Sequence, residues 1–239
     1  MEIIVDQLKK KYGSQFALDI SSLKIPGGEL VGIIGNNGAG KTTFFRLLLD
    51  LIQASAGNIQ ADGRDVAGSD HWKPTTGSFL DEGFLIDFLT PEEFFHFTGR
   101  LYGFTPAQID ERIQGFSRFM SGEILDQKKY IRQFSTGNRQ KIGIVAAMMV
   151  QPELLVLDEP FNFLDPSSQI LIKRMLQQEN KSRGTTMLLS SHNLNHITEI
   201  CNRIILLEHG RIIKDIRLPE DGLQEIEKYF SVSAGPENE

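Results

Sequence analysis

The sequence contains almost no cysteine, since Cys201 is the only one among its 239 residues. A single thiol cannot form a disulfide within the chain, which excludes a disulfide-stapled scaffold and fits a reducing compartment. We interpret Cys201 as a buried structural residue of a helix. The first residues, Met1 to Asp6, lack the basic and apolar regions of a secretory signal, so we expect none.

Long hydrophobic runs and an excess of basic charge are also missing. The longest apolar stretches, such as 142–150, fall well short of the roughly 20 residues that span a bilayer, so we expect no membrane crossing. Lysine and arginine number 25 against 31 acidic residues, a net charge of −6, and no long basic run stands out. Binding to a nucleic-acid backbone is therefore disfavoured, and we expect a cytoplasmic protein without a nucleic-acid partner.

What the sequence does contain is a glycine-rich loop between an apolar strand and a helix. The apolar run 30–34 precedes the loop, and the helical run 44–49 follows it. The loop fits G-x-x-x-x-G-K-[ST], in which backbone N–H groups enclose phosphate oxygens at a helix N-terminus. Lys41 would reach the β- and γ-phosphates, and the Thr42 hydroxyl would ligate Mg²⁺. The predicted nucleotide-binding residues are Gly35, Asn36, Asn37, Gly38, Ala39, Gly40, Lys41, Thr42 and Thr43.

Three further polar residues follow two apolar runs that are typical of buried strands. Asp158 and Glu159 end the run 153–157, and in parallel α/β sheets ligands bind beyond the carboxyl ends of such strands. Asp158 could hold Mg²⁺ through water, and Glu159 could accept a proton from an attacking water. His192 follows the run 185–190. A lone histidine is usually structural, but this one stands where it could sense the γ-phosphate.

The rest of the chain predicts an α/β core interrupted by helices. Strands are expected at 3–8, 16–23, 57–63 and 77–80, and a hairpin at 204–213. Tyr12 lies in the first connection; the residues alone leave open whether it stacks on a base or is an ordinary turn residue. Thr90 and Thr105 each precede a proline and a helical pattern, so residues 84–150 form a helical insertion. Its expected core residues are Phe94, Phe95, Phe97, Leu101, Ile109, Ile113, Phe116 and Phe119.

The stretch from Phe134 to Lys141 resembles the L-S-G-G-Q signature of ATP-binding-cassette (ABC) ATPases. With the glycine-rich loop, the strand before Glu159, a D-loop at 162–165 and His192 as the switch histidine, the resemblance covers nearly all residues in the family's order. It implies an α/β fold with a P-loop NTPase core, an antiparallel β subdomain and an inserted α-helical subdomain. The expected parts are 1–83 with 151–218 as the core, 84–150 as the helical subdomain, and 219–239 as a terminal helix and tail.

The resemblance also implies roles for individual residues. Tyr12 would stack on adenine, Glu159 would be the catalytic base, and Asp165 would belong to the D-loop. Two cassettes would close head to tail around two ATP molecules, with Ser135 and Gly137 binding the γ-phosphate held by the other subunit. The signature residues carried over are Phe134, Ser135, Thr136, Gly137 and Asn138. Both halves of the site look complete, which favours a homodimer.

Two positions depart from the family pattern. Asp81, or Glu82 if the register slips by one, stands where the family has the Q-loop glutamine, and Asp81 could still ligate Mg²⁺. In the signature, Thr136 replaces the first glycine and Asn138 replaces the glutamine, which predicts an altered loop geometry.

The leading hypothesis is an ATPase subunit on the cytoplasmic face of the membrane, powering a separate integral membrane permease. The segments Leu-Thr-Pro-Glu-Glu and Leu-Tyr-Gly look like bacterial drug, bacteriocin or ABC-2-type exporter cassettes, and import is the weaker alternative. A second hypothesis is a soluble ABC ATPase that remodels a protein or ribosome complex. A third hypothesis is a different P-loop enzyme, such as a GTPase or a small-molecule kinase. A GTPase should contain N-K-x-D, but the nearest stretch, 180–183, ends in Arg183.

Overall fold

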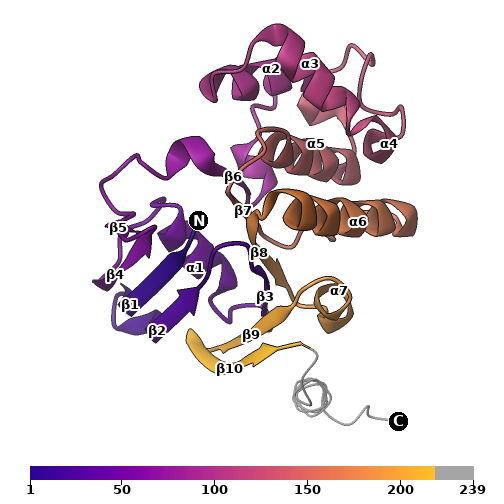
Figure 1. The fold of residues 1–239 in the computed structure, drawn as a ribbon. Helices are drawn as coiled ribbons and strands as arrows, with labels where there is room; N and C mark the ends of the chain where they lie inside the picture. Colours follow the sequence, from indigo (N-terminus) through magenta and orange to yellow (C-terminus); the bar gives the residue numbers. More distant parts are fainter. Residues whose placement is uncertain (219–239) are drawn as a thin grey trace, which may run out of the picture.

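Two β-sheets and a group of helices make up the fold of this computed structural model (Figure 1). The structure describes residues 1–218, so the terminal helix and tail predicted for 219–239 lie outside the described residues. The strands are β1 (Ile3–Tyr12), β2 (Gln15–Ile25), β3 (Leu30–Ile34), β4 (Ala56–Ala61), β5 (Arg64–Asp65), β6 (Thr76–Phe79), β7 (Leu154–Leu157), β8 (Thr186–Ser191), β9 (Arg203–Glu208) and β10 (Arg211–Arg217). The helices are α1 (Lys41–Leu48), α2 (Pro91–Leu101), α3 (Pro106–Gln114), α4 (Ser117–Met120), α5 (Thr136–Met149), α6 (Pro166–Arg183) and α7 (Leu194–Thr198), with 3-10 turns η1 (Lys73–Thr75), η2 (Glu82–Phe84) and η3 (Ile131–Gln133).

The larger sheet has six strands in the order β10-β9-β3-β8-β7-β6. Its five strands from β9 to β6 are parallel, and β10 pairs antiparallel with β9. Strands β3 and β7 are buried at every residue, as expected for strands covered on both faces. The smaller sheet, β2-β1-β4-β5, is antiparallel throughout. The predicted α/β class with an antiparallel β subdomain is therefore confirmed.

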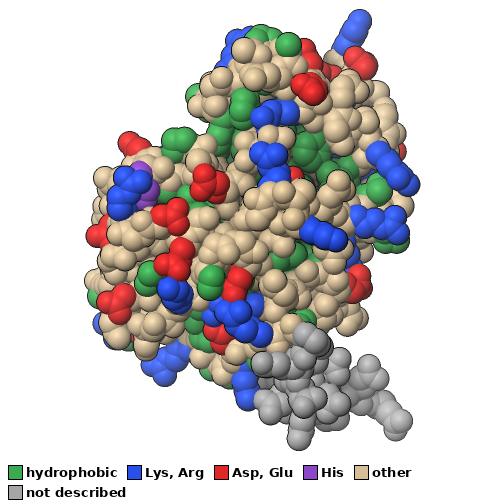
Figure 2. Space-filling model, viewed as in Figure 1, with side chains coloured by type: hydrophobic (Ala, Val, Ile, Leu, Met, Phe, Trp, Pro, Cys, Tyr) green, Lys and Arg blue, Asp and Glu red, His purple; other side chains and the backbone are tan. Residues whose placement is uncertain are grey.

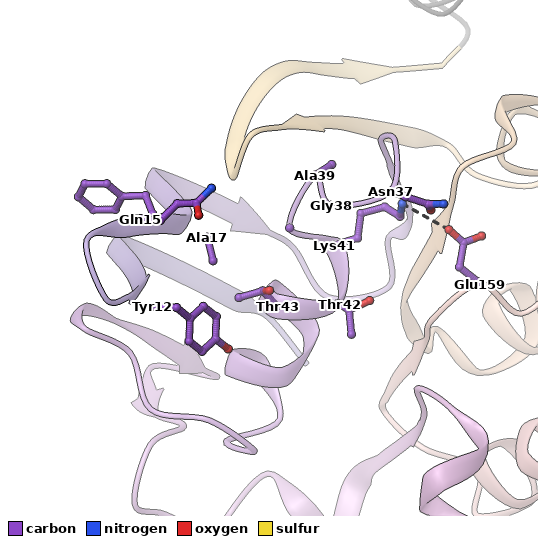
Figure 3. Close-up of a pocket in the computed structure, with 12 residues that line it drawn as sticks. Tyr12, Gln15, Ala17, Asn37, Gly38, Ala39, Lys41, Thr42, Thr43 and Glu159 are labelled. Atoms are coloured by element: carbon purple, nitrogen blue, oxygen red, sulfur yellow. Dashed lines mark ion pairs between the residues drawn. The ribbon is translucent and has the colours of Figure 1, made fainter. Parts of the chain in front are cut away.

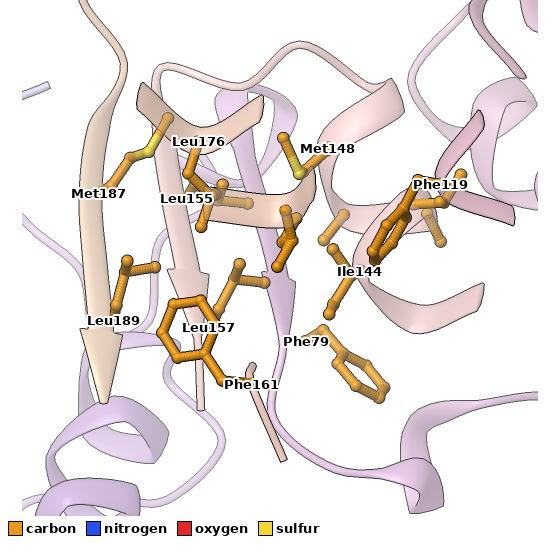
Figure 4. Close-up of a cluster of buried hydrophobic side chains, with 14 of the residues drawn as sticks. Phe79, Phe119, Ile144, Met148, Leu155, Leu157, Phe161, Leu176, Met187 and Leu189 are labelled. Carbon is orange, nitrogen blue, oxygen red and sulfur yellow. The ribbon is translucent and has the colours of Figure 1, made fainter. Parts of the chain in front are cut away.

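The six-stranded sheet separates two hydrophobic cores. Successive side chains of a strand point to opposite faces, and in β7 Leu154 and Val156 enter one core while Leu155 and Leu157 enter the other. The first core also holds the apolar sides of α1 and of the smaller sheet. Figure 4 shows the second, where Leu155 and Leu157 face the helices. This double covering fixes the strand ends from which the site is built.

The inserted helices begin where their sequence predicts. Thr90 and Thr105 form capping boxes with Glu93 and Gln108, and a proline follows each cap. Helix α5 is buried from residue 140 to 149 and packs against β6. Because this helix shares a core with the sheet, the insertion is not a separate globule.

Two of the expected core residues are exposed. Phe97 is 46% exposed and Leu101 is 71% exposed, so their assignment to the core was wrong. Helix α2 is amphipathic, and it buries the face that carries Phe94 and Phe95. Phe97 lies about 160° around the helix from Phe95, and Leu101 is the last residue of α2. Figure 2 shows hydrophobic side chains at the surface around the helical part of the molecule.

Several expected boundaries also shift. Tyr12 is the last residue of β1 rather than part of the connection. Cys201 is buried, as expected, but it follows α7 instead of lying in a helix. Residues 84–150 hold α2 to α5 and no strand, and we propose on this basis the subdivision into 1–83 with 151–218, and 84–150. Within the described residues, no helix has the length and apolarity to span a bilayer.

Candidate nucleotide site

Four segments that carry the predicted site residues leave the carboxyl ends of neighbouring parallel strands. The glycine-rich loop follows β3, Asp81 lies just beyond β6, Asp158 and Glu159 follow β7, and His192 follows β8. Because these strands are parallel, their carboxyl ends lie at one edge of the sheet, where ligands of open α/β sheets bind. The topology therefore brings together groups that lie far apart in the sequence.

The glycine-rich loop folds around the amino group of Lys41. Gly40 has φ 106° at the N-cap of α1, a left-handed conformation that side chains disfavour. A Cβ at Gly40 would also lie 2.9 Å from the carbonyl oxygen of Ala17. The Lys41 Nζ donates to the Gly35 oxygen at 2.6 Å and to the Asn36 oxygen at 3.4 Å. The loop thus holds a buried cation beside the N-terminus of a helix, which suits phosphate binding.

The Asp158 carboxylate accepts hydrogen bonds from two hydroxyl groups. The Thr42 hydroxyl donates to its Oδ2 and the Ser190 hydroxyl donates to its Oδ1. Burial raises the pKa of Asp158 above its ordinary value, and the hydrogen bonds from Ser190 and Thr42 act in the opposite direction. A threonine hydroxyl beside a desolvated carboxylate is an oxygen-donor set of the kind that Mg²⁺ prefers, and a cation there would offset the cost of the buried charge. These residues therefore fit a magnesium ion.

Glu159 connects the glycine-rich loop with His192. Its Oε1 lies 3.4 Å from the Lys41 Nζ (Figure 3). Its Oε2 lies 3.0 Å from the His192 Nδ1. The backbone N–H of His192 also donates to Oε2 at 3.3 Å. Glu159 has φ 47°, a left-handed conformation that costs energy for a side-chain-bearing residue and is often found at functional sites. The predicted base and the predicted switch histidine are thus in contact.

Two residues that the sequence analysis did not predict hold the backbone of Glu159. The Ser190 hydroxyl accepts from the Glu159 N–H at 2.7 Å, and the Gln140 side chain donates to the Glu159 carbonyl at 3.2 Å. Ser190 could have been found, because it is a polar residue near the carboxyl end of a buried strand. Nothing in the sequence indicated that Gln140, on α5, would reach this segment.

A cavity of about 390 Å³ extends from Glu159 along the loop to Tyr12 (Figure 3). Its lining residues are Tyr12, Gln15, Phe16, Ala17, Asn37, Gly38, Ala39, Gly40, Lys41, Thr42, Thr43 and Glu159. The Tyr12 ring is 56% exposed, with the Lys10 ammonium 5.0 Å from its centroid. The cavity thus has an exposed aromatic ring at one end and the glycine-rich loop at the other, an arrangement that suits a nucleotide.

A second cavity, of about 290 Å³, adjoins the first at Glu159. It is lined by Leu80, Asp81, Glu82, Thr136, Gln140, Asp158, Glu159, Asn162 and Phe163. The Asp81 carboxylate accepts from the Gly83 N–H at 2.8 Å and lies 3.4 Å from the Arg46 guanidinium. Glu82 lies 3.0 Å from the guanidinium of Arg139. Both acidic residues at the predicted Q-loop position are therefore paired with arginines.

The signature residues form the start of α5. Ser135 is the N-cap, and its hydroxyl accepts from the Asn138 N–H at 3.3 Å. A Cβ on Gly137 would lie 2.6 Å from the carbonyl oxygen of Phe163, so the signature touches the D-loop of the same chain. Of the predicted signature residues, Phe134, Ser135, Gly137 and Asn138 line neither of the two cavities. Ser135 therefore does not line the cavity that the glycine-rich loop of the same chain helps to form.

Asp165 has a structural role at the end of the D-loop. It caps α6 by accepting from the Ser168 N–H at 3.0 Å, and it also accepts from the Ser167 and Ser168 hydroxyls. These hydrogen bonds hold the pKa of Asp165 well below its ordinary value. Lys141 of α5 lies 3.7 Å from the same carboxylate.

Comparison with known proteins agrees with this geometry. The family model described as ABC transporter matches residues 18–162. Among the relatives, the bacitracin transport ATP-binding protein BcrA of Bacillus licheniformis is 32% identical over 97% of this chain and 74% of its own length. The lantibiotic transport ATP-binding protein SrtF of Streptococcus pyogenes is 31% identical over 95% of both chains. A solved ATP-binding subunit of an ABC transporter is 27% identical, with a TM-score of 0.83, over 97% of this chain and 94% of that one. Since the family model spans more than half of the residues and relatives align over nearly all of them, this chain belongs to the ABC transporter family as an ATP-binding, ATP-hydrolysing subunit.

Proposed function

We propose that this chain binds ATP with Mg²⁺, hydrolyses it within a dimer of two copies, and powers a separate integral membrane permease that exports its substrate. The relatives named for bacitracin and lantibiotic transport support export. In this arrangement the chain lies on the cytoplasmic face of the membrane, held there by the permease. The bound nucleotide occupies the cavity between Tyr12 and Glu159, with the base on the Tyr12 ring.

The observation that carries this proposal is the position of Glu159. Its two carboxylate oxygens face Lys41 and His192, and its side chain lines both cavities. A carboxylate at that junction is placed to take a proton from a water molecule attacking the terminal phosphate. His192 fixes the carboxylate by two hydrogen-bonding groups, its ring and its backbone N–H.

Thr42 and Asp158 are the residues we assign to the magnesium ion. When bound, Mg²⁺ supplies positive charge to the phosphate oxygens. Asp81 was the third predicted ligand. Both of its oxygens are engaged in the structure, by the Gly83 N–H and by Arg46, so Asp81 reaches a metal only if the Arg46 pair opens.

A second copy completes the site in this proposal. Ser135 and Gly137 lie at the N-terminus of the 14-residue helix α5, a position that favours anions. They line neither cavity of their own chain, which agrees with a role toward the phosphate held by the other copy. Phe163, 70% exposed in the neighbouring D-loop, is available to the same partner.

The experiment is to express tagged Glu159→Gln in the native cell, solubilise the membranes with ATP present, and identify what co-purifies. The amide cannot act as a base, so we expect retained ATP binding, a trapped dimer and hydrolysis reduced roughly 10²- to 10⁴-fold. Glu123→Gln, an exposed carboxylate in the helical part, is the matched control and should keep wild-type turnover.

The co-purified protein decides between the functions. A stoichiometric multi-spanning protein supports transport, and its sequence shows whether it is an export or an import permease. A trapped dimer that stays soluble, alone or with a ribosomal or assembly protein, refutes the transport proposal in favour of a remodelling ATPase. Wild-type turnover in Glu159→Gln removes Glu159 from its assigned role.

A further inference from the structure

The residues that depart from the family pattern contact one another through Arg139. The Arg139 Nη2 lies 3.0 Å from the Glu82 Oε2, and the same nitrogen donates to the Thr136 hydroxyl at 3.3 Å. Glu82 is the alternative Q-loop position, one residue after Asp81, and Thr136 replaces the first glycine of the signature. Two departures far apart in the sequence are thus joined by one guanidinium.

The position of Arg139 on its helix needs this partner. It is the fourth residue of α5, and its N–H donates to the Ser135 carbonyl at 2.9 Å in the first turn. A cation near a helix N-terminus opposes the helix dipole, so an arginine there is disfavoured unless an anion offsets it. Glu82 supplies that anion from outside the helix. The side chains of Glu82 and Arg139 are 31% and 29% exposed, so water screens the pair only in part.

Glu82 and Arg139 contact each other through one pair of atoms, although a carboxylate and a guanidinium can form two such contacts. The Glu82 Oε1 and the Arg139 Nε are both buried and have no hydrogen-bond partner in the described part of the chain. A guanidinium and a carboxylate can form two parallel hydrogen bonds, which would use both of these atoms.

The segment that carries Glu82 is anchored on its other side as well. Asp81 caps the η2 turn through the Gly83 N–H and lies 3.4 Å from Arg46 of α1, the helix that begins at the phosphate loop. Glu82 and Thr136 both line the second cavity, which reaches Glu159. A continuous series of contacts thus runs from α1 through residues 81 and 82 to the signature.

We propose that Arg139 is a positioning residue: held by Glu82, it fixes Thr136 and thereby orients the Ser135 to Gly137 turn toward the phosphate carried by a second copy of this chain. This inference rests on the proposed dimeric function. It assigns the acidic residues at the Q-loop position to an arginine contact within the chain. The signature then responds to any displacement of residues 81 and 82.

The test measures ATP-dependent dimer formation in a Glu159→Gln background by analytical ultracentrifugation. We expect Arg139→Gln and Glu82→Gln each to raise the ATP concentration for half-maximal dimerisation about tenfold, because either change breaks a charge-assisted contact. Binding of a fluorescent ATP analogue to the monomer should change less than about twofold, because neither residue lines the nucleotide cavity. The matched control is Arg183→Gln, which breaks a pair of similar length, 3.1 Å to Glu179, within α6.

A double-mutant cycle tests the step from Arg139 to Thr136. If the guanidinium acts through the hydroxyl, Arg139→Gln should have less than about a twofold further effect in a Thr136→Ala background. The proposal is overturned if the effects of Arg139→Gln and Thr136→Ala on dimerisation are fully additive. It is also overturned if Arg139→Gln needs the same ATP concentration for half-maximal dimerisation as Arg183→Gln. If Arg139→Gln fails to fold, Glu82→Gln decides alone by the same criterion. Failure of the Glu159→Gln reference itself to dimerise refutes the proposed function, and this inference with it.

Discussion

Replacing Gly137 by alanine tests whether the signature and the D-loop are packed as the structure shows. The new methyl group would lie 2.6 Å from the carbonyl oxygen of Phe163. A carbon and an oxygen in ordinary contact lie about 3.3 to 3.6 Å apart, so the two backbones must separate by roughly 0.7 to 1 Å. No flexible side chain can absorb this shift, since the atom in the way belongs to the backbone. Phe163 already has φ 63°, which leaves it little freedom to rotate away.

The expected cost follows from two opposing effects. Overpacking of this kind costs about 1 to 3 kcal/mol. Replacing glycine within a helix returns up to about 1 kcal/mol, and less in the first turn, where Gly137 lies. The free energy of unfolding should therefore fall by roughly 1 to 2 kcal/mol. For a chain of this length, that lowers the unfolding temperature by about 2 to 8 °C.

The effect on turnover should exceed the effect on stability. A displacement approaching 1 Å in a positioning group can cost on the order of 10²-fold in rate, so we expect ATP hydrolysis to fall roughly 10- to 100-fold. ATP binding to the monomer should be unchanged, because Gly137 does not line the nucleotide cavity. The assays are differential scanning fluorimetry, steady-state ATPase kinetics and titration with a fluorescent ATP analogue.

Gly27→Ala provides the matched control for this experiment. Its added Cβ would come no closer than 3.5 Å to any neighbour, an ordinary contact, so stability and turnover should stay at wild-type values. Gly137→Ala with an unfolding temperature within about 1 °C of wild type and full turnover would show that the close approach to Phe163 does not exist.

Three further predictions follow from other parts of the structure. Asp158→Asn should raise the unfolding temperature of the nucleotide-free chain at pH 7. Burial raises the pKa of this carboxyl above its unfolded value. The contribution of the carboxyl to stability is therefore present below the unfolded pKa and is lost as the pH rises through the native pKa. An unfolding temperature of Asp158→Asn below that of the wild type in scanning fluorimetry contradicts this reasoning. Arg203→Leu should cost about 1.5 to 3 kcal/mol in urea unfolding, because it removes the guanidinium that lies 2.7 Å from Asp215 and leaves Glu29 with Arg217 alone, at 2.6 Å. Tyr12→Ala should weaken ATP binding by about 1 to 3 kcal/mol while Tyr12→Trp keeps it, and equal affinities in a binding titration would exclude stacking.

Much of the fold was predictable because its strongest signals are local. Uninterrupted apolar runs gave β3 and β7, and capping residues gave the starts of α2 and α3. What the patterns could not give is which residues of an amphipathic helix meet a neighbour. Phe97 and Leu101 match the helical period as well as Phe95 does, yet only Phe95 is buried. That difference depends on how α2 packs against α3 and α5, a tertiary property.

The candidate site was predictable where a motif fixes the chemistry. The glycine-rich loop and Glu159 are brought together as expected, because both follow parallel strands of one sheet. Contacts between motifs were not predictable, since nothing in the local sequence couples Gln140 to Glu159 or Glu82 to Arg139. The individual catalytic and binding roles remain predictions.

The strained residues of the site all contact the beginning of α5. Glu159 and Phe163 both have positive φ, and both lie in the connection between β7 and α6. Gln140 donates to the Glu159 carbonyl, and Gly137 lies against the Phe163 carbonyl, so adjacent turns of one helix touch both residues. Conformations that cost energy persist only where the surroundings hold them. A movement of the first turns of α5 therefore has to change the backbone around Glu159 or break its bond to Gln140, which couples the signature helix to the residue proposed as the base.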